Sequence, residues 1–249
     1  LRVDHAALVD PGLAEGGRVR IGVLSDLQTE SVGGYERRAV AELAAQEPDL
    51  VLVPGDLFQG DDAAFEANRA ALVELLSSID APGGVFLVEG DTDGGPARGR
   101  LASLAEASGA TYLYDEVVTT TVGGRTVTIA GAPLQPSFEG YRIHDRLAAA
   151  DPATFRIVLA HRPDWVLRVP EAAADLVVAG HTHGGQVQLP GFGPLLTHSR
   201  LPRHVAAGGL HEVGGVPVYV SSGVGHEQQG APQVRFLAPP SVGVVDLVP

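Results

Sequence analysis

The pattern of apolar positions predicts alternating strands and helices in the first half of the chain. Three apolar runs end in a polar turn, which is typical of buried strands: residues 19–26, 50–56 and 84–91. Three helical segments alternate with them. The first covers residues 33–50 and is broken near Pro48, and the third covers residues 101–107. In the second, Leu72, Leu75, Leu76 and Ile79 share one face.

The second half is mostly β. Two β-branched runs flank Gly123-Gly124 within residues 116–132, which predicts a hairpin. Further short strands are predicted at residues 155–161, 175–181, 216–222, 233–238 and 242–248. We therefore expect an α/β fold with two sheets face to face and helices outside. Residues 1–17 are predicted as an irregular lead-in, and residues 18–249 as a single domain.

Composition narrows the functional classes. The formal net charge of −13 argues against a nucleic-acid binder that relies on a basic surface, and it would repel a phosphate substrate unless a metal reversed the sign locally. The chain has no cysteine, which excludes disulfides and thiolate chemistry. Methionine is absent even at position 1, so we expect a processed or truncated chain whose N-terminal signal or anchor is missing. No apolar run reaches the ~18 residues of a transmembrane helix.

Acidic residues and histidines follow one strand after another. They are Asp26, Asp56, Asp91, His161, His181 and His183. Any one of them could be an ordinary turn residue or helix cap, but in open α/β sheets the carboxyl ends of strands gather at the ligand site. Aspartate and histidine without cysteine suit divalent Mn, Fe or Zn. The sequence therefore predicts a metal centre at this edge.

The stretch Gly-His-Thr-His-Gly-Gly, residues 180–185, supports that prediction. Alternate residues of an extended chain point to one side, so His181 and His183 can each reach a different metal ion. The flanking glycines allow sharp bends and leave space free of side chains.

Five blocks in this order resemble the signature of the calcineurin-like metallophosphoesterase superfamily: SDLQ, GDLFQG, EGDTD, LAHRPD and GHTHGGQ, from Ser25 to Gln186. The segment HTHGGQVQLPGFGPL resembles a bacterial subgroup that is often membrane-anchored. The resemblance implies a four-layer α/β/β/α sandwich of two mixed β-sheets flanked by helices. It also implies hydrolysis of phosphate esters by a hydroxide that bridges two metal ions.

The same resemblance assigns roles to the strand-end residues. Asp26 and His183 would bind the first metal, and Asp56 would bridge both metals. His161 and His181 would hold the second metal, with Asp91 at the position of the family's asparagine.

Three positions depart from the family pattern. Gln28 stands where a histidine is usual, Asp91 replaces an asparagine, and Thr92 replaces the histidine that contacts phosphate and protonates the leaving group. An amide oxygen is a poorer ligand than imidazole for Zn or Fe, which favours Mn. General acid catalysis contributes about 10²–10⁴-fold, so we expect a diester or an activated ester as the substrate.

The main alternative is a catalytically impaired binding or scaffold protein on the same fold. A metallo-hydrolase acting on another bond, such as an amide, is disfavoured by the block order. Three further residues are weaker candidates for substrate binding: Arg162, His198 and His204. For each of them, an ordinary surface position is the competing interpretation.

The expected substrate is a phosphoester, either a small molecule or a lipid-like one. The segment LPGFGPLL could form a lip for a hydrophobic portion of it, or could simply pack beside the site. We expect no nucleic-acid partner. Membrane association through a missing N-terminal segment, or export, is slightly favoured over a cytoplasmic location, and the oligomeric state is left open.

Overall fold

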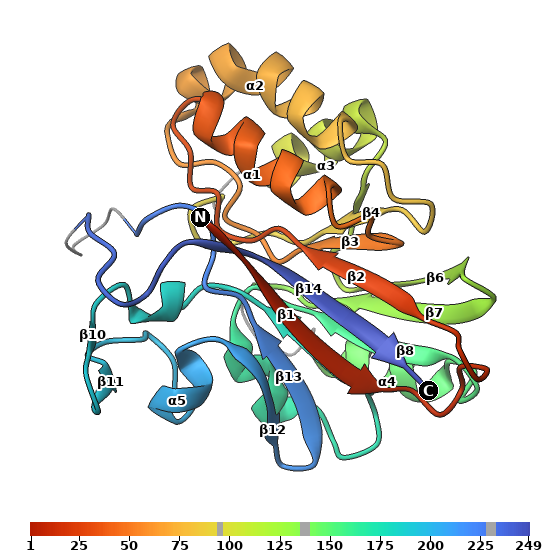
Figure 1. Ribbon diagram of the computed structural model, residues 1–249. Helices are drawn as coiled ribbons and strands as arrows, with labels where there is room; N and C mark the ends of the chain where they lie inside the picture. The colour runs from red at the N-terminus through yellow and green to blue at the C-terminus, as the bar shows by residue number, and fades with distance from the viewer. Residues whose placement is uncertain (94–96, 135–139, 228–232) are drawn as a thin grey trace.

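The chain forms two large mixed sheets in a computed structural model that describes residues 1–93, 97–134, 140–227 and 233–249 (Figure 1). The first sheet has the order β1-β14-β2-β3-β4-β5. Its strands are β1 (Arg2–Val9), β2 (Val19–Val23), β3 (Leu50–Val53), β4 (Val85–Leu87), β5 (Thr111–Tyr112) and β14 (Ser241–Val248). β2 to β5 run parallel, whereas β14 is antiparallel to β2.

The second sheet has the order β12-β13-β9-β8-β7-β6. Its strands are β6 (Glu116–Val122), β7 (Arg125–Gly131), β8 (Phe155–Leu159), β9 (Leu176–Ala179), β12 (Gly209–Val213) and β13 (Val216–Val220). β6 and β7 form the predicted hairpin, with Val122 opposite Arg125 across the two glycines. A small separate hairpin pairs β10 (Gln188–Leu189) with β11 (Gly193–Pro194).

Helices cover the outer faces of both sheets. The α-helices are α1 (Gly34–Ala44), α2 (Asp62–Ser77), α3 (Ala97–Ser108), α4 (Gly140–Ala149) and α5 (Arg203–Ala206). Two 3-10 segments are η1 (Pro163–Arg168) and η2 (His183–Gly185). α1, α2 and α3 lie together on the outer face of the first sheet (Figure 1). None of the helices in the described ranges has both the length and the apolarity that crossing a bilayer requires.

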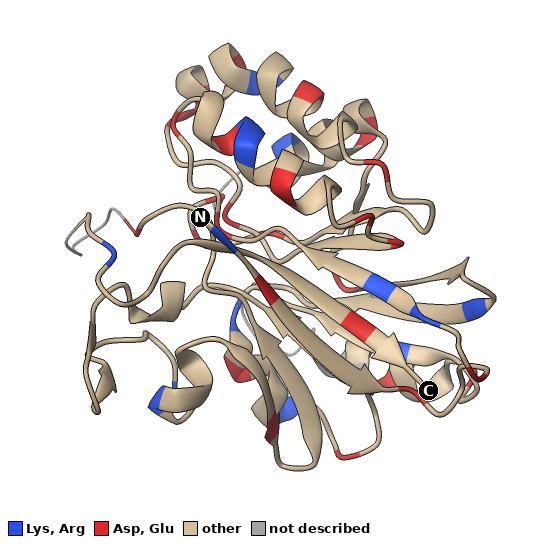
Figure 2. Ribbon diagram, viewed as in Figure 1, with Lys and Arg blue, Asp and Glu red and all other residues tan. Residues whose placement is uncertain are grey.

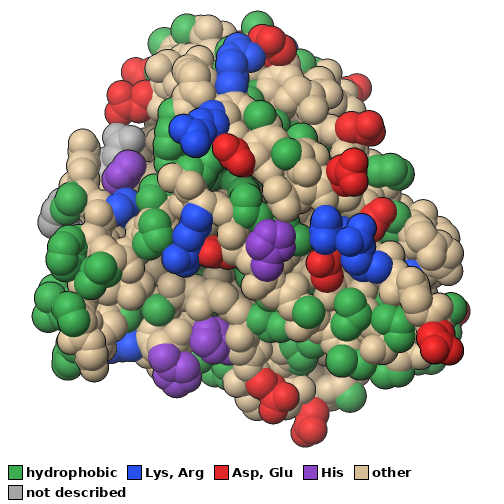
Figure 3. All heavy atoms as spheres, viewed as in Figure 1, with side chains coloured by type: hydrophobic (Ala, Val, Ile, Leu, Met, Phe, Trp, Pro, Cys, Tyr) green, Lys and Arg blue, Asp and Glu red, His purple; other side chains and the backbone are tan. Residues whose placement is uncertain are grey.

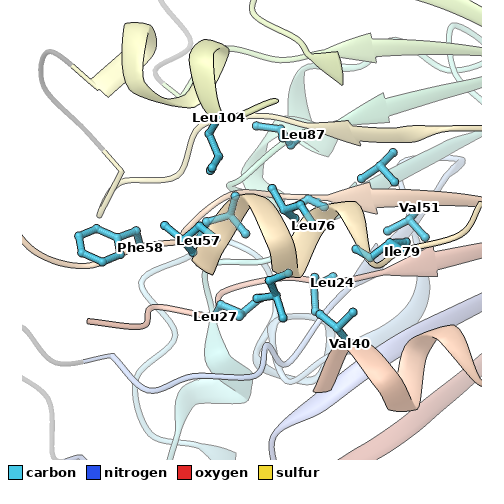
Figure 4. Packing of buried hydrophobic residues seen from close by; sticks show 14 of the residues in the cluster. Leu24, Leu27, Val40, Val51, Leu57, Phe58, Leu76, Ile79, Leu87 and Leu104 are labelled. Atoms are coloured by element: carbon cyan, nitrogen blue, oxygen red, sulfur yellow. The ribbon is translucent and has the colours of Figure 1, made fainter. Parts of the chain in front are cut away.

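Three apolar cores separate the four layers. In β3, Val51 and Val53 face the core under α1 to α3, where Figure 4 shows Val51 among the residues of that core. Leu50 and Leu52 face the core between the sheets, as the two-residue period of a strand requires. A third core packs α4, η1 and α5 on the outside of the second sheet. The expected α/β/β/α sandwich is thus confirmed.

Two predicted segments were wrong. Residues 1–17 were expected to be irregular, but Arg2 to Val9 form β1, paired in parallel along its whole length with β14. Its partner lies more than 230 positions away, so the local pattern gave no sign of it. Residues 233–238 were expected to be a strand, but they make only an isolated bridge between Phe236 and Val187.

Candidate metal centre

The strand-end residues converge at one edge of the two sheets, as predicted. They form two groups, within each of which the ligand atoms lie within 4.8 Å of one another. The first ligand group consists of Asp26, Asp56 and His183, and the second ligand group of Asp91, His161 and His181. This division matches the one implied by the family resemblance.

The backbone at the centre is strained. Positive φ angles, which non-glycine residues seldom adopt, occur at five of the seven predicted ligands: Asp26, Gln28, Asp56, His181 and His183. Each such residue costs on the order of 1–3 kcal/mol and persists only where its surroundings enforce it. Strain concentrated at one cluster is typical of a functional site.

Two glycines let the loops approach the carboxylates. A Cβ at Gly90 would overlap Oδ1 of Asp56, and a Cβ at Gly180 would overlap Oδ2 of Asp26. Any larger residue at these positions would displace a predicted ligand. The glycines of the motifs are therefore part of the site's geometry.

Asp56 lies at the junction of the two groups. Its Oδ2 is 3.1 Å from Nε2 of Gln28 and 3.5 Å from Nε2 of His161, and its Oδ1 accepts the backbone N–H of Thr92 at 2.9 Å. Burial raises the pKa of Asp56 well above its usual value, although His161 opposes the shift. A carboxylate in this place needs a nearby positive charge to remain ionised.

His161 is held in a defined orientation. Its Nδ1 lies 2.9 Å from the carbonyl oxygen of Pro54, which can only accept, so Nδ1 carries the proton and Nε2 faces the cluster. Burial lowers the pKa of His161, but Asp56, Asp91 and Asp26 outweigh it and raise the pKa to about 10. Without a cation, this ring therefore supplies positive charge to the surrounding acids.

Two buried nitrogen atoms test whether a metal fits. Nε2 of His181 and Nε2 of His183 have no hydrogen-bond partner among the described residues. Nε2 of His183 is 3.8 Å from Oδ1 of Asp26, and burial lowers the pKa of His183 to about 4, which keeps the ring in the neutral form that binds metals. Buried imidazole and carboxylate atoms of this kind fit a divalent cation.

The three departures from the family pattern also lie at the centre. Gln28 donates from its amide nitrogen to Asp56, so ligation through its oxygen stays a prediction. Oδ2 of Asp91 is 3.2 Å from Nδ1 of His181 and 3.0 Å from the Arg162 guanidinium. Burial opposes ionisation of Asp91, but hydrogen bonds from His161 and His181 hold its pKa below the usual value. The Thr92 hydroxyl donates to the carbonyl of Phe58 at 3.2 Å.

Two pockets open beside the cluster. One, of about 260 Å³, is lined by His181, His183 and apolar residues of the loop after them, and the other, of about 440 Å³, contains Arg162. His198 lines both pockets, so the structure brings this candidate to the site. His204 lines neither, and its ring packs edge-on against His211 instead.

Sequence reasoning missed two residues that position the candidate ligands, one of them buried and the other partly buried. The Asp93 carboxylate accepts backbone N–H groups of Gly90, Asp56, Leu57 and Phe58, which ties two strand-end loops together. Its place within the block EGDTD was the available signal.

Arg235 is the second missed residue. Its guanidinium donates to the carbonyls of His183 and Ser222 at 2.6 and 2.8 Å and lies 3.0 Å from Nδ1 of His183. It also donates to the carbonyl of Gly225. A lone arginine in the apolar stretch QVRFLAPP was the only sequence signal for it.

Proteins similar in sequence to this chain include some named as metallophosphoesterases or phosphodiesterases. The chain is 31% identical to the uncharacterised metallophosphoesterase YkuE of Bacillus subtilis, over 85% of this chain and 72% of that protein. It is 28% identical to the phosphodiesterase YaeI of Escherichia coli, over 75% of this chain and 67% of that protein.

Two solved structures share the fold at low identity. A putative 5'-nucleotidase from Staphylococcus aureus has a TM-score of 0.53 at 13% identity, covering 93% of this chain and 55% of that one. GAP50, described as the anchor in the inner membrane complex of Plasmodium, has a TM-score of 0.52 at 14%, covering 93% and 82%.

The sequence pattern of the calcineurin-like phosphoesterase family matches residues 19–185, which include every predicted ligand from Asp26 to His183. That range covers most of the chain and both ligand groups. The resemblance predicted from the five sequence blocks is confirmed, and the chain belongs to the calcineurin-like phosphoesterase family.

Proposed function

We propose that this protein is a phosphoesterase that holds two divalent cations and hydrolyses phosphodiesters or activated esters. The observation that carries the proposal is the pair of carboxylate–imidazole groups, joined where Asp56 of the first lies 3.5 Å from His161 of the second. Two ions so close together would activate a water molecule and neutralise phosphoryl oxygens. The donor set of carboxylates, imidazoles and one amide favours Mn, with Fe or Zn as alternatives.

The chain's own residues hold and orient these groups. Asp56 belongs to the first group and lies next to His161 of the second, and the Thr92 N–H and the Gln28 amide fix its two oxygens. Arg162 points one nitrogen at Asp91 and lines the 440 Å³ pocket, where it can bind a phosphoryl oxygen. A guanidinium at this pocket would offset, next to a phosphoryl group, the net charge of −13 that otherwise repels an anionic substrate.

The preference for a diester or activated ester follows from the missing acid. The Thr92 hydroxyl is engaged with a backbone carbonyl, and of the predicted substrate-binding histidines only His198 lies at the pockets. A good leaving group needs no protonation, so it loses least from this substitution.

The first test measures metal content and turnover together. Protein stripped with chelator and then incubated with Mn²⁺ is analysed for metal per chain and assayed on bis(p-nitrophenyl) phosphate and on an alkyl monoester. We expect close to two ions and faster cleavage of the diester. His181→Gln should reduce both readings, whereas His5→Gln, on the exposed face of β1, should change neither.

Two results would contradict the proposal. A folded protein that binds one ion or none and has no turnover with any divalent metal would favour the scaffold function. Cleavage of the alkyl monoester at least as fast as the diester would refute the substrate preference.

A further inference from the structure

An exposed apolar surface borders the candidate metal centre. Of the ten exposed large hydrophobic side chains in the described ranges, seven lie in two short segments. We call these seven the apolar rim: Leu189, Phe192, Leu195, Leu196, Val234, Phe236 and Leu237, each between 42% and 59% exposed. Hydrophobic side chains gather at the edge of the molecule where β10 and β11 lie (Figures 1 and 3). Contiguous exposed apolar patches mark interaction surfaces.

The two segments of the rim are held side by side. The Gln188 N–H donates to the carbonyl of Phe236 at 2.9 Å, and the Phe236 N–H donates to the carbonyl of Gln186 at 2.8 Å. β10 and β11 form a hairpin on the other side of this contact. The rim is therefore a built surface and not a set of loose loops.

The rim continues into the metal centre. Leu195 and Leu196 line the 260 Å³ pocket together with His181 and His183. A hydrocarbon group seated on the rim would thus be part of a molecule that can reach the ligand groups. Because the rim and the metal centre are continuous, the surface on which the rim docks should also contain the substrate.

The charge around the rim is complementary to an anionic surface. Residues 176–211 contain no Asp or Glu, although the whole chain has 30 acidic residues. Arg203 lies 4.4 Å from the centre of the Phe192 ring, and Arg168 and Arg200 line the 440 Å³ pocket. Each pocket also has one acid in its lining, Asp164 in the larger and Glu227 in the smaller. Figure 2 shows blue and no red along α5, next to β10 and β11. Aromatic and leucine side chains flanked by arginine are typical of segments that enter the headgroup region of anionic bilayers.

We propose that the apolar rim docks on an anionic lipid bilayer and brings the metal centre to phosphoesters of amphiphiles lying in that surface. The inference rests on the proposed function for its chemistry, but bilayer binding can be measured separately. The apolar side chains enter among the lipid chains, and the arginines meet the headgroups. The rim therefore sets the substrate class: a phosphoester that carries a hydrocarbon chain.

The test compares variants on vesicles. Wild-type protein should co-sediment with vesicles of phosphatidylglycerol and phosphatidylcholine more than with phosphatidylcholine alone. The double variant F192Q/F236Q should bind at least about tenfold more weakly, because it removes two side chains from the apolar phase. Val9→Gln removes an equally exposed side chain, 62% exposed on β1, and should bind like wild type.

Turnover of bis(p-nitrophenyl) phosphate in solution separates this inference from the proposed function. The double variant should keep wild-type turnover on that soluble diester and lose it only on a long-chain phosphodiester embedded in vesicles. Absence of soluble turnover in every variant would refute the proposed function and leave the binding result to stand alone.

Three results would overturn the docking proposal. They are wild-type protein that does not bind vesicles, a double variant that binds as well as wild type, and a dimer in sedimentation velocity that the double variant abolishes. The last result would identify the rim as an interface between two copies of the chain.

Discussion

The two ligand groups solve the same electrostatic problem in opposite ways. In the first group burial dominates: it raises the pKa of Asp56 and lowers that of His183 to about 4, so both shifts favour neutral side chains. In the second group pairing dominates: the pKa of Asp91 falls and that of His161 rises to about 10, so both shifts favour charged side chains. The first group tends towards neutral side chains, whereas acids of both groups, Asp56 foremost, favour the charged form of His161 in the second.

The difference shows what a bound cation would do at each place. In the first group it would offset the charge of Asp26 and Asp56, which His161 and Arg235 offset only in part. In the second group it would replace an existing arrangement in which His161 and Arg162 already compensate Asp91. The first group therefore depends most on exact ligand identity, and Gln28 stands beside that group, with its amide on Asp56.

The largest effect is expected where the two groups meet. Asp56→Asn should remove most metal from both groups, because its carboxylate is the only one that lies close to His161 of the second group while belonging to the first. Mutation of a residue that only hydrogen-bonds to a metal ligand lowers the affinity for the metal by about 10–100-fold. Loss of a candidate ligand itself should therefore lower the Mn²⁺ affinity by more than about 100-fold. Isothermal titration with Mn²⁺ measures the change, and full occupancy of either group would contradict the shared role.

Arg235→Gln should break only the first group. The guanidinium holds the backbone carbonyl of His183 and makes no contact with the second group that the described residues record. We expect a loss of about 10–100-fold in the affinity of one ion, as for other partners of metal ligands. Metal content per chain should fall from two towards one, while circular dichroism stays that of the folded protein.

Arg235→Lys is the matched control for that variant. It keeps a positive charge, but its single nitrogen cannot reproduce the planar fork with which separate guanidinium nitrogens reach different carbonyls, so the lysine variant should lose nearly as much metal affinity as the glutamine variant. Full recovery by lysine would show that charge, and not orientation of His183, is what Arg235 contributes.

Sequence reasoning could place the ligands because they follow a local rule. Asp26, Asp56 and His161 each come after a buried apolar run, and the topology of a parallel sheet brings such positions together. Arg235 and β1 could not be found in this way. The guanidinium contacts backbone carbonyls, one of them 52 positions away, and β1 depends on β14 at the other end of the chain. Backbone acceptors and distant edge partners leave no periodic signal in the residues themselves.

The role of Thr92 could not be predicted from the sequence for a related reason. Its type showed that a histidine was missing, but only the structure shows its N–H on Asp56 and its hydroxyl on Phe58. The position therefore supports a ligand even though the side chain is not the family's. A change of residue type does not report what the backbone at that position does.

Gln28→His should strengthen the first group and so reduce the contrast between the groups. An imidazole is a better ligand than an amide oxygen for Zn and Fe, the ions for which the gain should be measured, and position 28 already lies within reach of Asp56. We expect the affinity for one ion to rise on the order of tenfold. Single substitutions of residues around metal ligands change metal affinity by about 10–100-fold, and this gain lies at the lower end of that range. Competition with a fluorescent chelator measures this gain. Unchanged affinity would mean that the residue acts only through its hydrogen bond to Asp56.

The smallest effect is expected at a charge pair that belongs to neither group. The guanidinium of Arg20 on β2 binds both oxygens of Asp246 on β14, at 2.7 and 3.0 Å, and this hydrogen bonding lowers the pKa of Asp246 below its ordinary value of 3.8. A carboxyl whose pKa is lower in the folded chain stabilises the fold above its unfolded pKa, and that contribution disappears as the pH falls through the folded pKa. Asp246→Asn should therefore lower the free energy of unfolding at pH 7 by about 1 kcal/mol or less, since the pair is partly exposed.

Urea unfolding of the wild type and the variant at pH 7 and at pH 3 should show that the difference in unfolding free energy is smaller at pH 3. Metal content should stay at the wild-type value, because the pair holds two strands of the first sheet and contacts no ligand. A fall in metal content would mean that the strand-end loops depend on the body of the sheet more than their own hydrogen bonds indicate.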